Sequence, residues 1–320
     1  MPAVARPRLM QRLDPRLGLL TAAVLFSTGG AAIKAAALTS WQIASFRSGI
    51  AAVVVWLLVP RARARWTPRI VLVAAVYAAT MVLFVAANKL TTSANTIFLQ
   101  STAPLYVLLA GPLLLGERVT RTDLALVAAV AAGMALFFIA PGAPQTTAPD
   151  PARGNLLAAL SGVAWAGTVL GLRWLGRARP GPAQPTVVDE TNEAAVASGG
   201  PAPALVTVVA GNVIACLACL PAALPVTHPT AASVGVVLYL GVVQIGIAYL
   251  ALAAAMPHVP ALEASTLLLV EPALNPAWAY LVHGERPSTL AWLGGAIILL
   301  SALAKTWWDV RRPSRVYSVP

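Results

Sequence analysis

Residues 101–118 have the sequence STAPLYVLLAGPLLLGER, and residues 269–286 have the sequence LVEPALNPAWAYLVHGER. Pro104 corresponds to Pro272, and the Gly-Glu-Arg that ends the first stretch corresponds to the one that ends the second, each 168 positions later. The same offset relates the preceding Ala86-Ala87 to Ala254-Ala255. The second half of the chain therefore repeats the first.

A further pair of stretches supports the repeat. LLTAAVLFSTGG (19–30) matches LLAALSGVAWAG (156–167) at an offset of 137. Most of the difference between the two offsets is accounted for by residues 180–203, which are rich in Pro, Gly and Ala. This segment lacks the apolar content needed to fold, so we expect a disordered cytoplasmic linker, either a spacer or a regulatory element.

The composition places the chain in a membrane. Of its 320 residues 58% are hydrophobic and 10% are charged, with a mean hydropathy of +0.77. Soluble domains carry about 25% charged residues, so a soluble enzyme is excluded. Many apolar stretches have about 20 residues, the length that an α-helix needs to cross a bilayer. The expected fold class is an all-α polytopic membrane protein with ten spans: 17–37, 41–60, 68–88, 94–115, 122–140, 154–175, 204–224, 232–256, 261–282 and 288–306.

Five helices per half have a topological consequence. An odd number of crossings turns the second copy upside down, so the repeats 17–140 and 154–306 are expected to be inverted around a central cavity. Inverted repeats with a binding site near the midplane are typical of secondary transporters that work by alternating access. The ends of several spans coincide with Pro60, Pro141, Pro221 and Pro257, where a helix cannot easily continue.

The basic residues indicate the orientation. A formal charge of +11 on a soluble chain would suggest a nucleic-acid partner, but here the basic residues lie in short segments between apolar runs. With the N-terminus in the cytoplasm, seventeen Lys and Arg fall inside and four outside (Lys34, Lys89, Arg153 and Arg286), while Arg47 lies within a span. We therefore expect a bacterial-type plasma membrane, an uncleaved first helix, and cytoplasmic tails at 1–16 and 307–320.

Several residues carry a resemblance to a known family. They are Lys34, Phe46-Arg47, Trp165, Glu271-Pro272, and the Pro followed by Gly-Glu that ends helices 94–115 and 261–282. On these residues the chain resembles the EamA family of the drug/metabolite transporter superfamily over nearly its full length. The resemblance implies ten helices in two inverted repeats, a central cavity, and export or exchange of small metabolites. The first copy departs from the Glu-Pro pattern, since Ala103 precedes Pro104.

Ionisable residues within a bilayer need a partner or a wet cavity. Glu271 lies about 13 Å into helix 261–282, near the midplane, and shares a face with Asn275 and Trp278. We expect Glu271 to bind a substrate amine or a proton, with a structural salt bridge as the alternative. Pro272 loosens this helix and exposes carbonyls.

Two basic residues are further candidates. Arg47 stays protonated and needs either a structural acceptor or a substrate carboxylate. Lys34 either snorkels to the interface or faces the permeation path. Arg47 and Lys34 together with Glu271 could bracket a zwitterion. Glu117 and Glu285, at the ends of their helices, are expected to be structural latches that contact their following Arg or nearby helix ends.

Polar and aromatic stripes mark the remaining helices. The longest consists of Tyr77, Thr80, Phe84 and Asn88, and a matching one of Ser161, Trp165 and Thr168; Thr96 with Gln100, and Gln244 with Tyr249, mark two more helices. Such faces line water or join helices. The substrate-binding candidates are therefore Lys34, Arg47, Tyr77, Thr80, Phe84, Asn88, Gln100, Trp165, Tyr249, Glu271, Asn275 and Trp278.

Other functions find little support. No Walker loop, Ser/His/Asp arrangement or cluster of metal ligands is present in the sequence, so we expect no enzyme, cofactor or metal. Cys216 and Cys219 are expected to be packing residues. The leading hypothesis is a secondary active or facilitative exporter of a small polar or amphipathic metabolite such as an amino acid or amine, with protons as a candidate partner and a homodimer as a candidate assembly. The alternatives are a drug or organic-cation exporter and, more remotely, a non-transporting membrane enzyme or scaffold.

Overall fold

The computed structural model describes residues 14–115, 120–140, 142–177, 201–227, 229–259 and 261–311. Within these ranges the chain is helical apart from short connections and one isolated bridge between Gln145 and Ala148. Seven helical stretches are long and apolar enough to cross a bilayer, and Thr289–Lys305 is a shorter apolar helix. The chain is therefore an all-α membrane protein, which confirms the prediction from composition. The predicted linker 180–203 lies outside these ranges up to residue 200, and its last three residues are helical, as the start of Pro201–Ala223. Most of the terminal tails, and Glu117 with Arg118, also lie outside these ranges.

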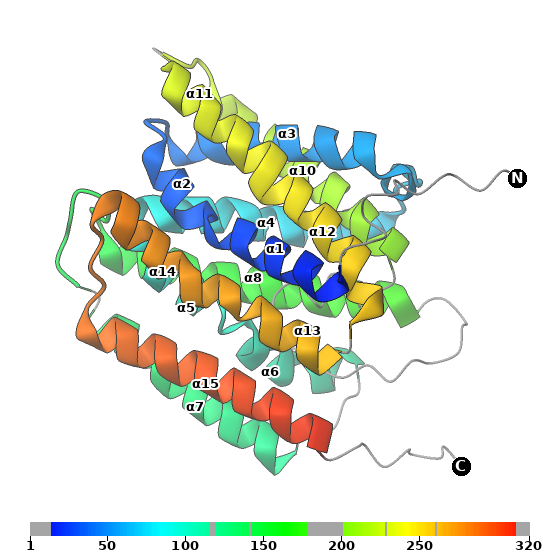
Figure 1. Cartoon of the computed structure of the whole chain (residues 1–320), viewed down its shortest axis with the longest axis vertical. Helices are drawn as coiled ribbons and strands as arrows, with labels where there is room; N and C mark the ends of the chain where they lie inside the picture. The colour runs from blue at the N-terminus through cyan, green and yellow to red at the C-terminus, as the bar shows by residue number, and fades with distance from the viewer. Residues whose placement is uncertain are drawn as a thin grey trace, which may run out of the picture.

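The helices follow the apolar runs of the sequence closely (Figure 1). The first half contains α1 (Pro15–Ser27), α2 (Gly29–Ala35), α3 (Ser40–Leu58), η2 (Pro60–Arg63), α4 (Pro68–Leu90), α5 (Ser93–Gln100), α6 (Ala103–Leu115) and α7 (Arg121–Ile139). The second contains α8 (Pro151–Arg177), α10 (Pro201–Ala223), α11 (Ala231–Leu238), η3 (Tyr239–Ile247), α12 (Ala248–Ala255), η4 (Met256–His258), α13 (Ala261–Leu268), α14 (Val270–His283) and α15 (Thr289–Arg311). Pro221 does not end α10, which continues to Ala223.

Threonine side chains cap the N-termini of several helices. Thr39 accepts a hydrogen bond from the backbone N–H of Gln42, and the Gln42 side chain accepts one from the Thr39 N–H. This reciprocal pair is a capping box, which satisfies N–H groups that have no partner within the helix. Thr120 and Asp123 form another at the start of α7, and single threonine caps precede α4, α5 and α11.

Two of the expected spans are broken at equivalent positions. α5 ends at Gln100 and α13 ends at Leu268, each four residues before a proline of the repeat, Pro104 and Pro272. A proline removes the hydrogen bond to the carbonyl four residues earlier and its ring clashes with that carbonyl, so the helix ends there. The sequence predicts a loosened helix at Pro272, and the structure adds the break at Pro104.

Two further irregularities face each other. The first span divides at Thr28 into α1 and α2, and the span 231–255 contains the nine-residue π-helix η3. Gln244 of η3 lies against Gly29, where an added Cβ would be 2.8 Å from its amide nitrogen. The hydroxyls of Thr28 and Tyr239 are 2.8 Å apart. Long π-helical segments are rare and are frequently found at functional sites.

The helices pack side by side in a bundle, with α7 and α15 at one edge. α4 lies between α8 and α10, α3 packs on α10, and α1 packs on α12 and α14. α7 and α15 run side by side at the lower edge of Figure 1. Their backbones approach closely, since a Cβ added at Gly294 would lie 2.6 Å from the carbonyl oxygen of Gly133. Lys305 and Asp123 form a buried ion pair of 3.1 Å between the same two helices.

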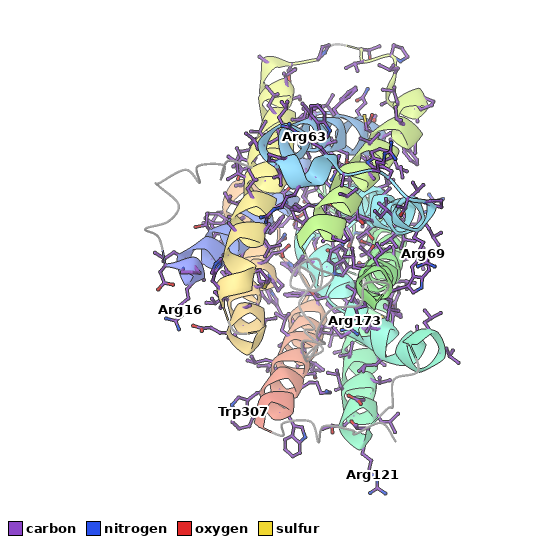
Figure 2. All side chains as sticks on the ribbon, turned by 90° about the vertical axis from the view of Figure 1, so that its right-hand side faces the viewer. Arg16, Arg63, Arg69, Arg121, Arg173 and Trp307 are labelled. Atoms are coloured by element: carbon purple, nitrogen blue, oxygen red, sulfur yellow. The ribbon has the colours of Figure 1, made fainter. Side chains whose placement is uncertain are left out.

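Five of the arginines that the sequence assigns to one side lie at one end of the bundle. Figure 2 looks onto the end where α1 begins and α15 ends, and labels five of these arginines there: Arg16, Arg63, Arg69, Arg121 and Arg173. They come from α1, η2, α4, α7 and α8. Lys34 and Lys89 lie in the last turns of α2 and α4, at the opposite end. We refer below to the end with the arginines as the arginine face and to the other as the lysine end.

Candidate translocation site

A buried aromatic group joins four helices in the interior. The Tyr77 hydroxyl on α4 donates a hydrogen bond of 3.3 Å to the Tyr249 hydroxyl on α12, and Asn212 on α10 donates one of 3.4 Å to Tyr77. The ring of Tyr77 lies 6.3 Å from that of Trp165 on α8. These four side chains, which we call the aromatic cluster, are all buried. The cluster brings together predicted site residues from both halves.

Phe26 extends the aromatic cluster to the first helix. Its ring meets that of Tyr249 edge to face, with centroids 5.1 Å apart. This geometry places the positive edge of one ring against the negative face of the other. The cluster therefore offers apolar ring surface beside a small set of hydroxyl and amide groups.

Arg47 reaches the same region from α3. Its guanidinium Nη2 contacts the carbonyl oxygen of Met81 at 3.4 Å and the Met81 sulfur at 3.6 Å. Met81 lies one turn after Tyr77 on α4. Arg47 is only 2% exposed, and its Nε has no hydrogen-bond partner.

A second polar group connects α4, α5 and α8. Gln100, the last residue of α5, donates a hydrogen bond of 2.8 Å to Ser161, and the Ser161 hydroxyl lies 3.4 Å from the carbonyl oxygen of Thr80. Phe84 and Asn88 continue the α4 stripe and are buried, with Asn88 bonded to the Phe84 carbonyl. The predicted stripes on these helices thus face one another, and the break after Gln100 is part of the contact.

The predicted face of α14 meets α1 and α2 instead of the aromatic cluster. Trp278 donates a hydrogen bond of 2.9 Å to Ser27. Asn275 is 1% exposed, and neither atom of its amide has a partner. A Cβ at Gly30 would lie 2.9 Å from the Asn275 oxygen and 2.8 Å from the Ser93 hydroxyl, so only glycine allows this approach. Glu271 on the same helix is half-buried.

Lys34 forms a buried ion pair at the lysine end. Its Nζ lies 2.8 Å from Oε1 of Glu285, and the two side chains are 2% and 1% exposed. Lys34 also donates to the carbonyls of Thr91 and Thr147. Glu285 accepts a hydrogen bond of 2.9 Å from the backbone N–H of Ser93 at the start of α5. The expected contact of Glu285 with a helix end is present, but its charged partner is Lys34 rather than the following Arg286.

An amide network closes the lysine end around this pair. Thr91 and Asn95 both donate to the side-chain oxygen of Asn155, at 2.8 and 3.0 Å, and Asn155 donates to the Phe137 carbonyl. Lys89 donates to the Ala36 carbonyl at 2.7 Å. The end of α4, the start of α5 and the start of α8 are thereby held together.

Three residues in these groups are absent from the sequence-based candidates. Asn155, Asn212 and Ser93 are each at most 1% exposed and take part in the contacts above. For Asn155 and Asn212 the available signal was an amide within a predicted span, since a buried amide in hydrocarbon needs a hydrogen-bond partner.

A family model matches both halves of the chain. The model described as EamA-like transporter family covers residues 16–139 and 197–306. The chain belongs to this family. EamA-like proteins are membrane transporters rather than enzymes, in agreement with the interior polar groups described above.

Solved structures share the fold of this chain. One, described as "Crystal structure of protein", superposes with a TM-score of 0.57 at 20% sequence identity. The match covers 94% of this chain and 99% of the other. At this identity the likeness concerns the fold alone. No curated protein matches the chain.

Proposed function

We propose that this EamA-like protein is a secondary active or facilitative transporter that exports a small polar or amphipathic metabolite, such as an amino acid or amine, by alternating access. The observation that carries the proposal is the hydrogen bond between Tyr77 and Tyr249, supported by Asn212 and Trp165. It joins helices of both halves through polar groups inside an apolar bundle. Sites of this composition, with ring surfaces and few polar groups, suit small amphipathic ligands.

The proposed topology has ten crossings. The pairs α1–α2, α5–α6 and α13–α14 and the continuous stretch α11–η3–α12 each form one crossing, and α3, α4, α7, α8, α10 and α15 form the others. An even number of crossings agrees with α1 beginning and α15 ending at the same end of the bundle (Figure 1). Five crossings per half would make the repeats inverted. The same family model on both halves and the equivalent breaks before Pro104 and Pro272 support this arrangement.

The arginine face is proposed to be cytoplasmic, in a bacterial-type plasma membrane. The excess of Lys and Arg on one side is the signal that orients polytopic proteins. Single cysteines at the exposed positions Arg65 and Arg153, in a chain with Cys216 and Cys219 replaced by alanine, test this orientation. An impermeant maleimide is expected to label position 153 on intact cells and position 65 only after permeabilisation. The opposite pattern would reverse the assignment.

Glu271 is the proposed proton-coupling residue. It lies on a half-buried face of α14, directly before Pro272 and near the break after Leu268. An acid at a broken helix near the midplane can exchange a proton or an amine with the cavity while carbonyls of the break provide further acceptors. Loss of this acid should abolish proton movement without unfolding the bundle.

Reconstitution in liposomes that contain a pH-sensitive dye tests the function. Pools of amino acids, amines and cationic drugs are added to wild type, Glu271→Gln and Glu263→Gln, the last being a matched control because Glu263 pairs with Arg16 near the arginine face. We expect one pool to drive a proton flux in wild type and the control but not in Glu271→Gln. Radiolabelled counterflow without proton flux would refute coupling, movement of cationic drugs alone would favour the drug-exporter alternative, and no movement of any pool in either assay would refute the transporter.

A further inference from the structure

Arg47 is a buried charge without a neutralising acid among the residues that the structure describes. A guanidinium is protonated at all physiological pH values. Moving such an ion out of water carries a desolvation penalty of several kcal/mol, which a paired counter-charge can offset. Lys34 and Lys305 are also buried in the part of the chain that the structure describes, and each pairs with an acid, Glu285 and Asp123. Among those same described residues, no carboxylate lies within 4 Å of a nitrogen of Arg47.

The contacts that Arg47 does make are weak. A distance of 3.4 Å to the Met81 carbonyl is long for an N–H···O bond, and a thioether sulfur is a weak acceptor. The Nε–H points at no acceptor although the residue is 2% exposed. The planar guanidinium presents its donors as a fork that fits the two oxygens of a carboxylate. Arg47 therefore keeps hydrogen-bond donors, its Nε–H among them, that the described residues leave weakly used or unused.

We propose that Arg47 binds the carboxylate of the transported solute, so that the substrate class is a small amphipathic carboxylate. This proposal rests on the transport function proposed above and narrows it. Met81 places the guanidinium one turn from Tyr77, so the solute's apolar part lies beside the rings of Tyr77, Trp165 and Tyr249. Asn212, whose side-chain oxygen is buried without a partner, supplies an acceptor for an N–H or O–H group of the solute.

Binding of the solute's carboxylate would offset the desolvation cost of the buried Arg47 charge. In this conformation the guanidinium rests on Met81, and a bound carboxylate would replace that contact with two charge-assisted hydrogen bonds. Lys34 has a different role, since its charge is already balanced by Glu285 at the lysine end. The positive charge that selects the solute is therefore that of Arg47.

Ligand-induced thermal stabilisation of the purified full-length protein in detergent tests the proposal. The probes are matched pairs of acid and amide: leucine and leucinamide, phenylalanine and phenylalaninamide, and indole-3-acetic acid and its amide. We expect at least one acid to bind wild type roughly ten-fold or more tightly than its amide. Arg47→Gln is expected to remove that preference, and Arg47→Lys to retain part of it, because Lys keeps the charge and loses the fork. Arg69→Gln, which removes an exposed charge stacked on Trp174, is the matched control.

The outcomes separate this proposal from the transport function. Wild type without any preference for acids, or an acid preference that survives in Arg47→Gln, would overturn the carboxylate site. Thermal stabilisation is also measured with chloride, relative to a methanesulfonate buffer. If chloride stabilises the protein as much as the acids do, Arg47 binds an inorganic anion and the carboxylate site is overturned. Liposome transport of amines or cationic drugs that Arg47→Gln leaves unchanged would overturn the carboxylate site while the transporter stands. If Arg47→Gln does not fold, the contrast between Arg47→Lys and Arg69→Gln decides.

Discussion

Lys34 and Glu285 are 251 positions apart in the chain and form an ion pair of 2.8 Å from which solvent is almost completely excluded. The pair connects the end of α2 in the first half with the residues that follow α14 in the second. Glu285 also holds the first N–H of α5. These contacts join the two halves of the chain at the lysine end.

Removing one charge of this pair is expected to destabilise the fold. Lys34→Met or Glu285→Gln leaves the other group buried with less compensation, and such changes typically lower the free energy of unfolding by about 3–5 kcal/mol. The double variant Lys34→Met/Glu285→Leu should recover much of the loss. Unfolding in detergent, analysed as a double-mutant cycle, measures the coupling.

The exposed pair Arg153 and Asp150 is the control, because its side chains are 82% and 39% exposed. Replacing Arg153 with Gln should change the free energy of unfolding by no more than about 1 kcal/mol. Equal effects at the buried and exposed pairs would show that burial of Lys34 and Glu285 does not determine their contribution.

The contact between α7 and α15 should tolerate no added methyl group. A Cβ at Gly294 would lie 2.6 Å from the Gly133 oxygen and 2.7 Å from the Phe137 ring. We expect Gly294→Ala to lower the free energy of unfolding by about 1–3 kcal/mol through overpacking. Gly235→Ala on α11 is the control, since nothing lies within 4 Å of its added Cβ, and should be neutral or stabilising.

The two prolines before which α5 and α13 end are expected to matter more for transport than for stability. Pro104→Ala or Pro272→Ala restores an N–H that can bond to Gln100 or Leu268 and favours a continuous helix. Thermal stability should remain equal or rise while the transport rate falls several-fold. Counterflow rates and unfolding midpoints of the same preparations distinguish this from simple misfolding, in which both would fall.

The hydroxyl of Tyr77 should contribute to both the stability of the fold and the affinity for the solute. Tyr77→Phe keeps the ring packed against Trp165 and removes the bonds to Tyr249 and Asn212. Each lost bond is worth about 0.5–1.5 kcal/mol. We expect a comparable loss of stability and a weaker apparent affinity for the solute, measured as the concentration that half-saturates counterflow. An unchanged affinity would place the solute away from the aromatic cluster.

The positions of the helices could be predicted from the sequence because each is a continuous apolar run. The ranges 41–60, 68–88 and 122–140 differ from α3, α4 and α7 by two residues or fewer at each end. The break before Pro272 follows from the missing N–H of proline and could be predicted as well. The π-helix η3 could not, because its residues are as apolar as those of an α-helix and nothing in its sequence distinguishes the two forms.

Less of the candidate site than of the fold could be predicted from the sequence. Stripes on single helices identified Tyr77 and Trp165, because side chains three or four residues apart share a helix face, and Tyr249 was identified as a polar aromatic residue within an apolar span. Which faces meet is decided by tertiary packing, so the partners of Lys34 and Trp278 could not be read from local spacing. Asn155 lies on α8 outside the stripe of that helix, and Asn212 belongs to no stripe on α10, so only the three-dimensional structure relates them to their neighbours.

The contact of Gly133 with Gly294 has a mechanical consequence. Backbone atoms in contact cannot approach further, and the ion pair of Asp123 with Lys305 resists separation of the same two helices. Any rearrangement of the two halves must therefore carry α7 and α15 together as one unit, and α11, at the opposite edge of the bundle (Figure 1), lies outside that unit.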